Sequence, residues 1–99
     1  MKDECGISDA VQFLENKTVP EDEVLSYIRV HPGEMTQEQI NKKFGLSPRE
    51  FGGIIERLLE IRFILEKNGK VFPTTFAAIM IEAYETLERC YKEDQNSKR

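Results

Sequence analysis

The chain has 99 residues, of which 39% are hydrophobic and 32% charged, with a formal net charge of −4. This length gives one domain with a single hydrophobic core, and no apolar run approaches the ~18 residues of a membrane span. Cys5 and Cys90 lack Cys-x-x-Cys or Cys/His spacing, which argues against a disulfide scaffold and a zinc site. Because the acidic N-terminus does not resemble a signal peptide, we expect a cytoplasmic protein with free thiols.

The charge is unevenly distributed along the chain. Residues 1–35 carry three Lys or Arg against eight Asp or Glu, whereas residues 36–75 carry seven against five. Residues 76–99 are again net acidic, with four against five. The middle of the chain is therefore the only net-basic third, and any contact with nucleic acid is assigned to it.

Two helices are predicted in the first third of the chain. Apolar residues and a Ser at the start indicate a short helix over residues 8–16. Thr18 and Glu21 have capping-box spacing, which predicts the start of a second helix. That helix ends at His31-Pro32-Gly33, where His31 is expected to act as a C-terminal cap and not as a metal ligand or a base.

A third and a fourth helix follow, separated only by Gly45 and Leu46. Thr36 opens the third helix with capping-box spacing to Gln39, and Gly45 supplies a left-handed residue after its end. Ser47 opens the fourth, with Pro48 at its first position and Glu50 at the reciprocal capping position. Its apolar face is predicted to lie along the core over its whole length and consists of Phe51, Ile54, Ile55, Leu58, Leu59 and Ile61.

The last third predicts a hairpin and a long helix. Asn68-Gly69 indicates a type I′ turn that pairs Lys67 with Lys70 and Leu65 with Phe72, and the second pair is expected to anchor the ribbon to the core. Thr74 or Thr75 then caps a helix over residues 76–93, followed by a frayed polar tail over residues 94–99.

The long helix carries a heptad-like apolar stripe, formed by Phe76, Met80, Ala83, Leu87 and Cys90. It has more apolar surface than a small core can cover, so we expect it to be the interface of a homodimer. Cys90 is then either a small packing residue or a thiol close to its symmetry mate and open to oxidation.

Two stretches resemble a known group of proteins. "MTQEQINKKFGLSPREFGGIIERLLEIRFI" resembles the helix-turn-helix of winged-helix regulators, and "NGKVFPTTFAAIM" resembles their wing strand and the Thr-capped helix after it. The resemblance is closest to small dimeric MarR- or PadR-like regulators. It implies a mainly α fold with a small β-hairpin, in which residues 18–75 form the helix-turn-helix and wing of a single domain spanning residues 1–99. The chain departs from the pattern at Arg62, where Gly is usual, and at "PTTF", which replaces "LTxxG".

The resemblance also implies a function, that of a sequence-specific regulator of transcription that binds double-stranded DNA. The fourth helix would enter the major groove and the wing would lie near the backbone or minor groove. A homodimer would place two such helices about 34 Å apart. The residues expected at DNA are Lys42, Lys43, Ser47, Arg49, Gly53, Arg57, Lys67 and Lys70.

Three features leave alternatives open. Glu56 and Glu60 lie on the face of the fourth helix that would contact DNA. They repel phosphate unless they point away or accept a hydrogen bond from cytosine. A winged-helix protein-interaction adaptor therefore stays as the second hypothesis. Gly52-Gly53 indicates either close approach of DNA or a partner helix, or tight packing against a neighbouring helix. No Gly-rich phosphate loop, activated nucleophile or metal-spaced cluster is present in the sequence, so neither catalysis nor a cofactor is expected.

Overall fold

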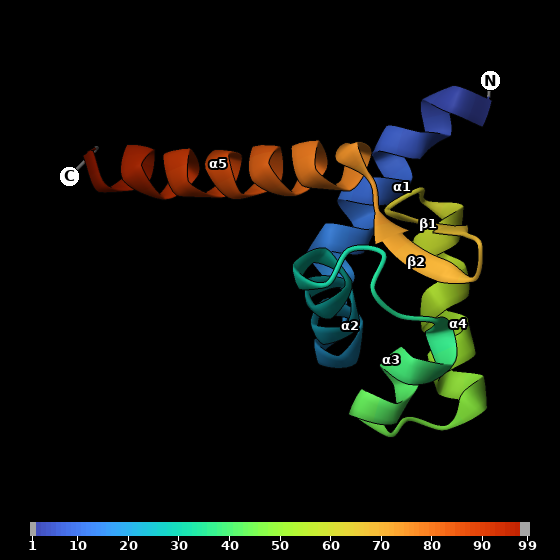
Figure 1. Cartoon of the computed structure of the whole chain (residues 1–99). Helices are drawn as coiled ribbons and strands as arrows, with labels where there is room; N and C mark the ends of the chain where they lie inside the picture. Colours follow the sequence, from blue (N-terminus) through green and yellow to red (C-terminus); the bar gives the residue numbers. More distant parts are fainter. Residues whose placement is uncertain (1, 98–99) are drawn as a thin grey trace.

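The structure is a computed structural model that describes the backbone of residues 2–97 and the side chains of residues 7–90. It is mainly helical with one small antiparallel hairpin (Figure 1). In chain order the elements are α1 (Lys2–Asn16), α2 (Val19–Val30), α3 (Gln37–Phe44), α4 (Pro48–Glu60), β1 (Ile64–Lys67), β2 (Lys70–Pro73) and α5 (Thr75–Ser97). The predicted order of elements is therefore confirmed.

The helix starts follow from capping. The side chains of Thr18 and Thr36 each accept a hydrogen bond from the backbone three residues on, and Glu21 and Gln39 return it, so both predicted capping boxes are confirmed. Ser47 accepts from the backbone N–H of Glu50 at 3.1 Å. At this helix the structure records only that half of the predicted box.

Two helix boundaries differ from the prediction. The first helix begins at Lys2 and not at Ser8, because no proline precedes Ser8 and the stretch continues into a packed face of Ala10, Phe13 and Leu14. The last helix continues to Ser97, so residues 94–97 belong to it and not to a frayed tail; no Gly or Pro interrupts that run.

The core fills the space between α1, α2, α4 and the hairpin. Phe13, Phe63 and Leu58 are at most 1% exposed, and the rings of Phe13 and Phe63 pack edge to face with centroids 5.7 Å apart. On α4 the core face is formed by Phe51, Ile54, Ile55 and Leu58, with Ile61 buried just after the helix end. Leu59 is 37% exposed, so its predicted place on the core face is wrong: it lies about 100° from Leu58 around the helix.

The hairpin has the predicted register, with Lys67 opposite Lys70 and Leu65 opposite Phe72. Asn68 and Gly69 both have positive φ, at 53° and 79°, as a type I′ turn requires. The predicted anchor pair is wrong for Leu65, which is 43% exposed, whereas its partner Phe72 is half-buried. The ribbon is fixed by the opposite face, through the buried side chains of Ile64 and Val71.

The segment between α2 and α3 pairs with the free edge of β2. Gly33 N–H donates to the carbonyl of Val71 at 2.9 Å, and Val71 N–H donates to the carbonyl of Met35 at 3.1 Å. This segment therefore pairs with the hairpin as a short third strand-like segment, although the sequence indicated only a helix end there. His31 caps α2 as predicted, with its N–H donating to the carbonyl of Tyr27.

The long helix α5 starts on the body and then projects away from it (Figure 1). Thr74 is its cap, because its hydroxyl accepts from the N–H of Ala77 at 3.0 Å and donates to the carbonyl of Arg62 at 2.6 Å. Arg62 itself has φ 65°, a left-handed conformation that Gly adopts more readily than other residues.

Candidate nucleic-acid interface

The connection between α3 and α4 is a tight turn held by one side chain. Gly45 has φ 69° and donates its N–H to the carbonyl of Asn41 at 2.7 Å. The Asn41 amide then bridges the turn, donating to the Leu46 carbonyl at 2.9 Å and accepting from the Leu46 N–H at 3.1 Å. The sequence interpretation missed Asn41; the signal was an Asn four residues before the left-handed Gly, because Asn side chains readily bond nearby backbone.

This turn sets the N-terminus of α4 at the surface. Pro48 has no N–H, and the N–H of Glu50 is bonded to Ser47. The N–H of Arg49 lies between them in the first turn, at the positive end of the helix dipole. The Arg49 side chain is exposed, so this end of α4 presents a cation beside a helix N-terminus, the arrangement that favours a phosphate.

The outward face of α4 is open along its first half. A β-carbon added at Gly52 or Gly53 would meet no atom within 4 Å. Tight packing of the two glycines against a neighbouring helix is therefore excluded among the residues whose side chains are described. Gly53 lies within about 40° of Arg49 around the helix, so the glycine pair leaves the backbone accessible next to this cation.

The second half of the same face is acidic and lies beside α1. Glu56 and Glu60 fall within about 20° of the Arg49 direction, because helical residues advance by about 100°. Arg57 is exposed, but its guanidinium lies over the Phe13 ring, 6.0 Å from the centroid. It also lines a shallow hollow with Asp9 and Glu60, about 12 Å along the helix from Arg49.

The two lysines of α3 point to different sides. Lys42 lines an apolar groove of about 720 Å³ between α3 and α4, together with Leu46, Pro48 and Gly52. Lys43 lies over the Tyr27 ring of α2, with its Nζ 5.9 Å from the centroid. Of the two, Lys42 shares the surface of the α4 N-terminus.

The hairpin tip presents the remaining predicted cations. Lys67 is exposed and Lys70 is half-buried, and they face each other across the turn. Next to them, Glu66 accepts a hydrogen bond from the Gln37 side chain at 3.2 Å, which ties the ribbon to the first residue of α3. The ribbon is therefore held beside the start of α3.

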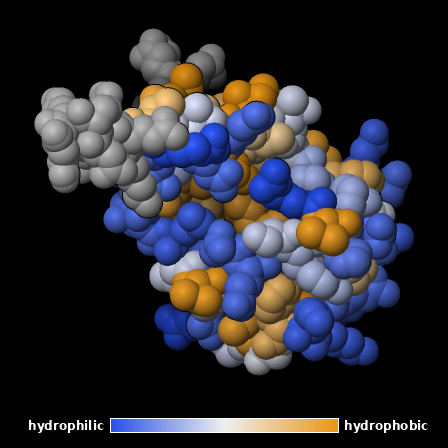
Figure 2. All heavy atoms as spheres, turned by 90° about the vertical axis from the view of Figure 1, so that its left-hand side faces the viewer, coloured by the Kyte–Doolittle hydropathy of each residue, from blue (hydrophilic) through white to orange (hydrophobic). Residues whose placement is uncertain are grey.

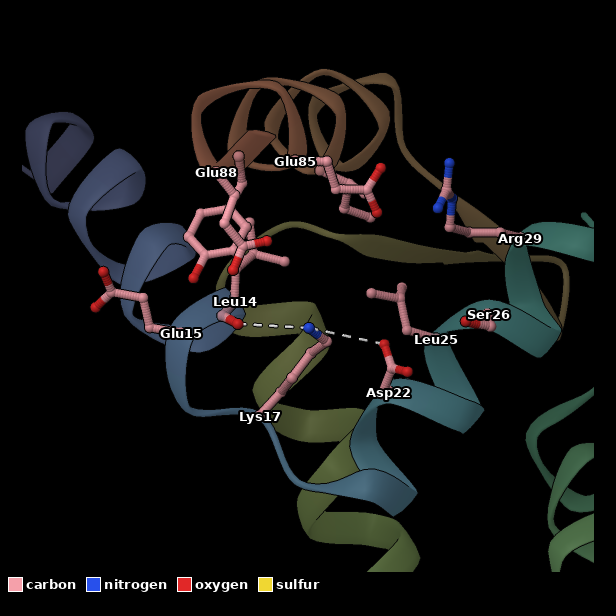
Figure 3. A pocket seen from close by; sticks show the side chains of 11 residues that line it. Leu14, Glu15, Lys17, Asp22, Leu25, Ser26, Arg29, Glu85 and Glu88 are labelled. Atoms are coloured by element: carbon pink, nitrogen blue, oxygen red, sulfur yellow. Dashed lines mark hydrogen bonds and ion pairs between the residues drawn. The ribbon is translucent and has the colours of Figure 1, made fainter. Parts of the chain in front are cut away.

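A separate cleft lies between the α1–α2 connection and α5 (Figure 3). It has a volume of about 440 Å³, and Lys17 spans its floor, with Nζ 3.4 Å from the Leu14 carbonyl and 3.8 Å from the Asp22 carboxylate. Burial raises the pKa of the Tyr84 hydroxyl at its edge, and the carboxylates of Glu88 and Glu15 raise it further. Four carboxylates make this cleft unsuitable for nucleic acid.

No group of three or more His, Cys, Asp or Glu among the described residues is placed to hold a metal ion. Within the same residues, every helix is too short or too polar to cross a membrane. Comparison of the chain with protein-family models, with curated proteins and with solved structures finds no match.

Proposed function

We propose that the protein is a winged-helix regulator that binds double-stranded DNA in a sequence-specific manner as a homodimer. In this assignment α3 and α4 form the helix-turn-helix, α4 is the recognition helix, and the β1–β2 hairpin is the wing. The short pairing of the Gly33–Met35 segment with β2 supports this reading, because it completes a small sheet beside the helix pair.

One observation carries the proposal: the outward face of the first two turns of α4 is exposed, carries Arg49 and has no side chain at Gly52 and Gly53. Two glycines in a helix interior cost roughly 1 kcal/mol each relative to Ala. Since the two glycines pack against none of the described side chains, this destabilisation is not offset by packing within that part of the fold. Close approach of a DNA backbone or base edge to α4 accounts for it.

The acidic half of α4 limits the contact. Glu56 and Glu60 lie beyond Gly53 along the helix and repel phosphates. Only the N-terminal part of α4 therefore enters the groove, in the manner of helices that read bases with their first turns. Lys42 and the wing-tip lysines Lys67 and Lys70 then hold the flanking phosphates, while Arg57 and Lys43 stand further from the duplex.

The same acidic residues favour a second candidate, a protein-interaction adaptor. In that case the glycine pair and the apolar groove beside Lys42 receive a partner helix. Binding of such a partner depends on apolar burial and changes little with salt. The dependence on salt therefore separates the two functions.

The test measures binding to random-sequence and selected duplex DNA over a range of salt, for the native chain and for Arg49→Ala and Gly53→Ala. We expect the logarithm of the DNA association constant to fall linearly with the logarithm of the salt concentration. Arg49→Ala should reduce this slope by about 1 if Arg49 contacts a phosphate, or cost about 1–3 kcal/mol of binding free energy at one selected site if it contacts a base. Gly53→Ala is expected to stabilise the fold by about 1 kcal/mol yet weaken DNA binding, which rules out misfolding as the cause.

Arg29→Ala, on the face of the acidic cleft, serves as the matched control and should leave the affinity and the slope unchanged. Glu60→Gln should strengthen binding only slightly, because it removes a charge that repels phosphate but lies beyond the part of α4 that enters the groove. DNA binding that is absent at low salt would overturn the assignment in favour of the adaptor, and DNA binding that is equal for the native chain and Gly53→Ala would overturn the role of α4 as the recognition helix.

A further inference from the structure

The predicted stripe on α5 is divided by the fold. Its first two members, Phe76 and Met80, are half-buried against the body. Ala83, Leu87 and Cys90 are exposed, and Leu87 retains 69% of its accessible surface. The C-terminal half of the stripe therefore has no partner among the described residues.

Ile79 extends this uncovered surface along one side of α5. It is 59% exposed and lies four residues before Ala83, so the exposed stripe comprises Ile79, Ala83, Leu87 and Cys90. Seen from the side towards which α5 projects, the surface of the molecule carries several separate hydrophobic patches among hydrophilic atoms (Figure 2). An apolar stripe at helical spacing on a projecting helix is suited to another helix.

We infer that this stripe binds α5 of a second copy running in the opposite direction, with Ala83 of each copy against Leu87 of the other. This inference rests on the proposed homodimer and adds its direction and register. The two-fold axis then crosses the helix pair at the level of residue 85, midway between Ala83 and Leu87, whereas the Glu85 side chain lines the cleft on the other side of α5.

Side-chain sizes match in this register. In a heptad-like stripe the spacing alternates between four and three residues, which gives two kinds of position, a and d. In an antiparallel pair each a position of one helix faces a d position of the other. Ala83 then faces Leu87, and Met80 faces Cys90, so each layer combines a larger with a smaller side chain. A parallel pair sets Ala83 against Ala83 and leaves a gap in that layer.

The charged residues of this part of α5 lie away from the stripe. Glu82, Glu85, Glu88 and Arg89 are each about 100° or more around the helix from the centre of the stripe, because helical residues advance by about 100°. No like charges therefore face each other across the pair of stripes.

The shape of the chain fits the same arrangement. α5 has 23 residues and is therefore about 34 Å long, with only its first turns on the body. Antiparallel pairing places the two bodies at opposite ends of the helix pair, so that neither obstructs the other. Each projecting half then lies along the first half of the partner's α5, where Met80 and Ile79 remain partly accessible.

Disulfide trapping tests the register. In chains carrying Cys5→Ser and Cys90→Ser, one variant adds Ala83→Cys and a second adds Leu87→Cys, and each is oxidised mildly alone and as an equimolar mixture. We expect covalent dimers almost only in the mixture, because the facing pair is Ala83 with Leu87 and identical positions are about 6 Å apart along the axis. Parallel pairing gives the reverse result, with dimers from each variant alone.

The native Cys90 provides a second arm in which the stripe is unaltered. With only Cys5→Ser, oxidation should not join Cys90 to its symmetry mate, because they lie about 15 Å apart along the axis. Cys90 dimers, or no dimer in the mixture, overturn the inference. Light scattering on the same samples shows which proposal fails. A dimer with the wrong crosslinks refutes only the direction and register, whereas a monomer also refutes the proposed homodimer. DNA affinity is measured separately and tests the DNA-binding function.

Discussion

At the scale of single residues, Gly33 shows how one position joins two elements. Its φ of 68° lies in the left-handed region, which favours Gly, and its N–H donates to Val71 in the hairpin. A β-carbon at this position would overlap the ring of Phe72. The sequence "HPG" therefore serves as a helix stop and as a close contact between backbone and hairpin.

Gly33→Ala is predicted to lower the free energy of unfolding by about 2–4 kcal/mol, from left-handed strain and displacement of the Phe72 ring together. Gly45→Ala is the matched control, since Gly45 has φ 69° but nothing within 4 Å of an added β-carbon. It should cost only about 1–2 kcal/mol. Urea unfolding of both variants measures the difference, and equal losses would show that the Phe72 contact carries no energy.

At the scale of elements, α4 combines two different surfaces on one helix. Its buried side fixes the helix against the core, and its outer side is open at the glycine pair. The two requirements do not compete, because a 3.6-residue period separates them by half a turn. Substitutions on the buried side of α4 should therefore change the stability of the fold, and substitutions on its outer side should change the proposed binding.

Leu58→Ala and Leu59→Ala test this division on adjacent residues. Leu58 is 0% exposed, so its truncation should cost about 2–5 kcal/mol through lost burial and a cavity. Leu59 is 37% exposed, and its truncation should cost less than about 1 kcal/mol. Thermal or urea unfolding provides the measurement. Losses of similar size would mean that Leu59 is covered in solution.

At the scale of the whole molecule, α5 gives the chain its elongated dimensions of 50 × 33 × 22 Å. Its first turns belong to the folded body, where the rings of Phe76 and Phe63 pack with centroids 5.9 Å apart. Its later turns extend beyond the body (Figure 1). In the proposed homodimer, folding and association depend on different residues of the same helix.

Phe76→Ala and Leu87→Ala should separate folding from association. Phe76→Ala is predicted to destabilise the monomer by roughly 3 kcal/mol, because it removes an aromatic contact with the core. Leu87→Ala should leave the unfolding of dilute monomer unchanged and raise the dimer dissociation constant at least about tenfold. Sedimentation over a concentration series checks this. An unchanged dissociation constant for Leu87→Ala would place the interface elsewhere.

The sequence alone determined the order of the elements, the capping boxes at Thr18 and Thr36, the left-handed turn at Gly45 and the hairpin register around Asn68-Gly69. These features depend on hydrogen bonds and backbone angles within a few residues, so local sequence is sufficient to specify them.

Only the tertiary structure decided which side chains of each element are covered. It placed Ile64 and Val71 in the core in place of Leu65, and it left Leu59 and Leu87 exposed. It also showed that Arg49 lies next to an open helix face whereas Arg57 lies against α1. Burial and the grouping of charges depend on contacts between segments distant in sequence, and periodicity within one element does not contain that information.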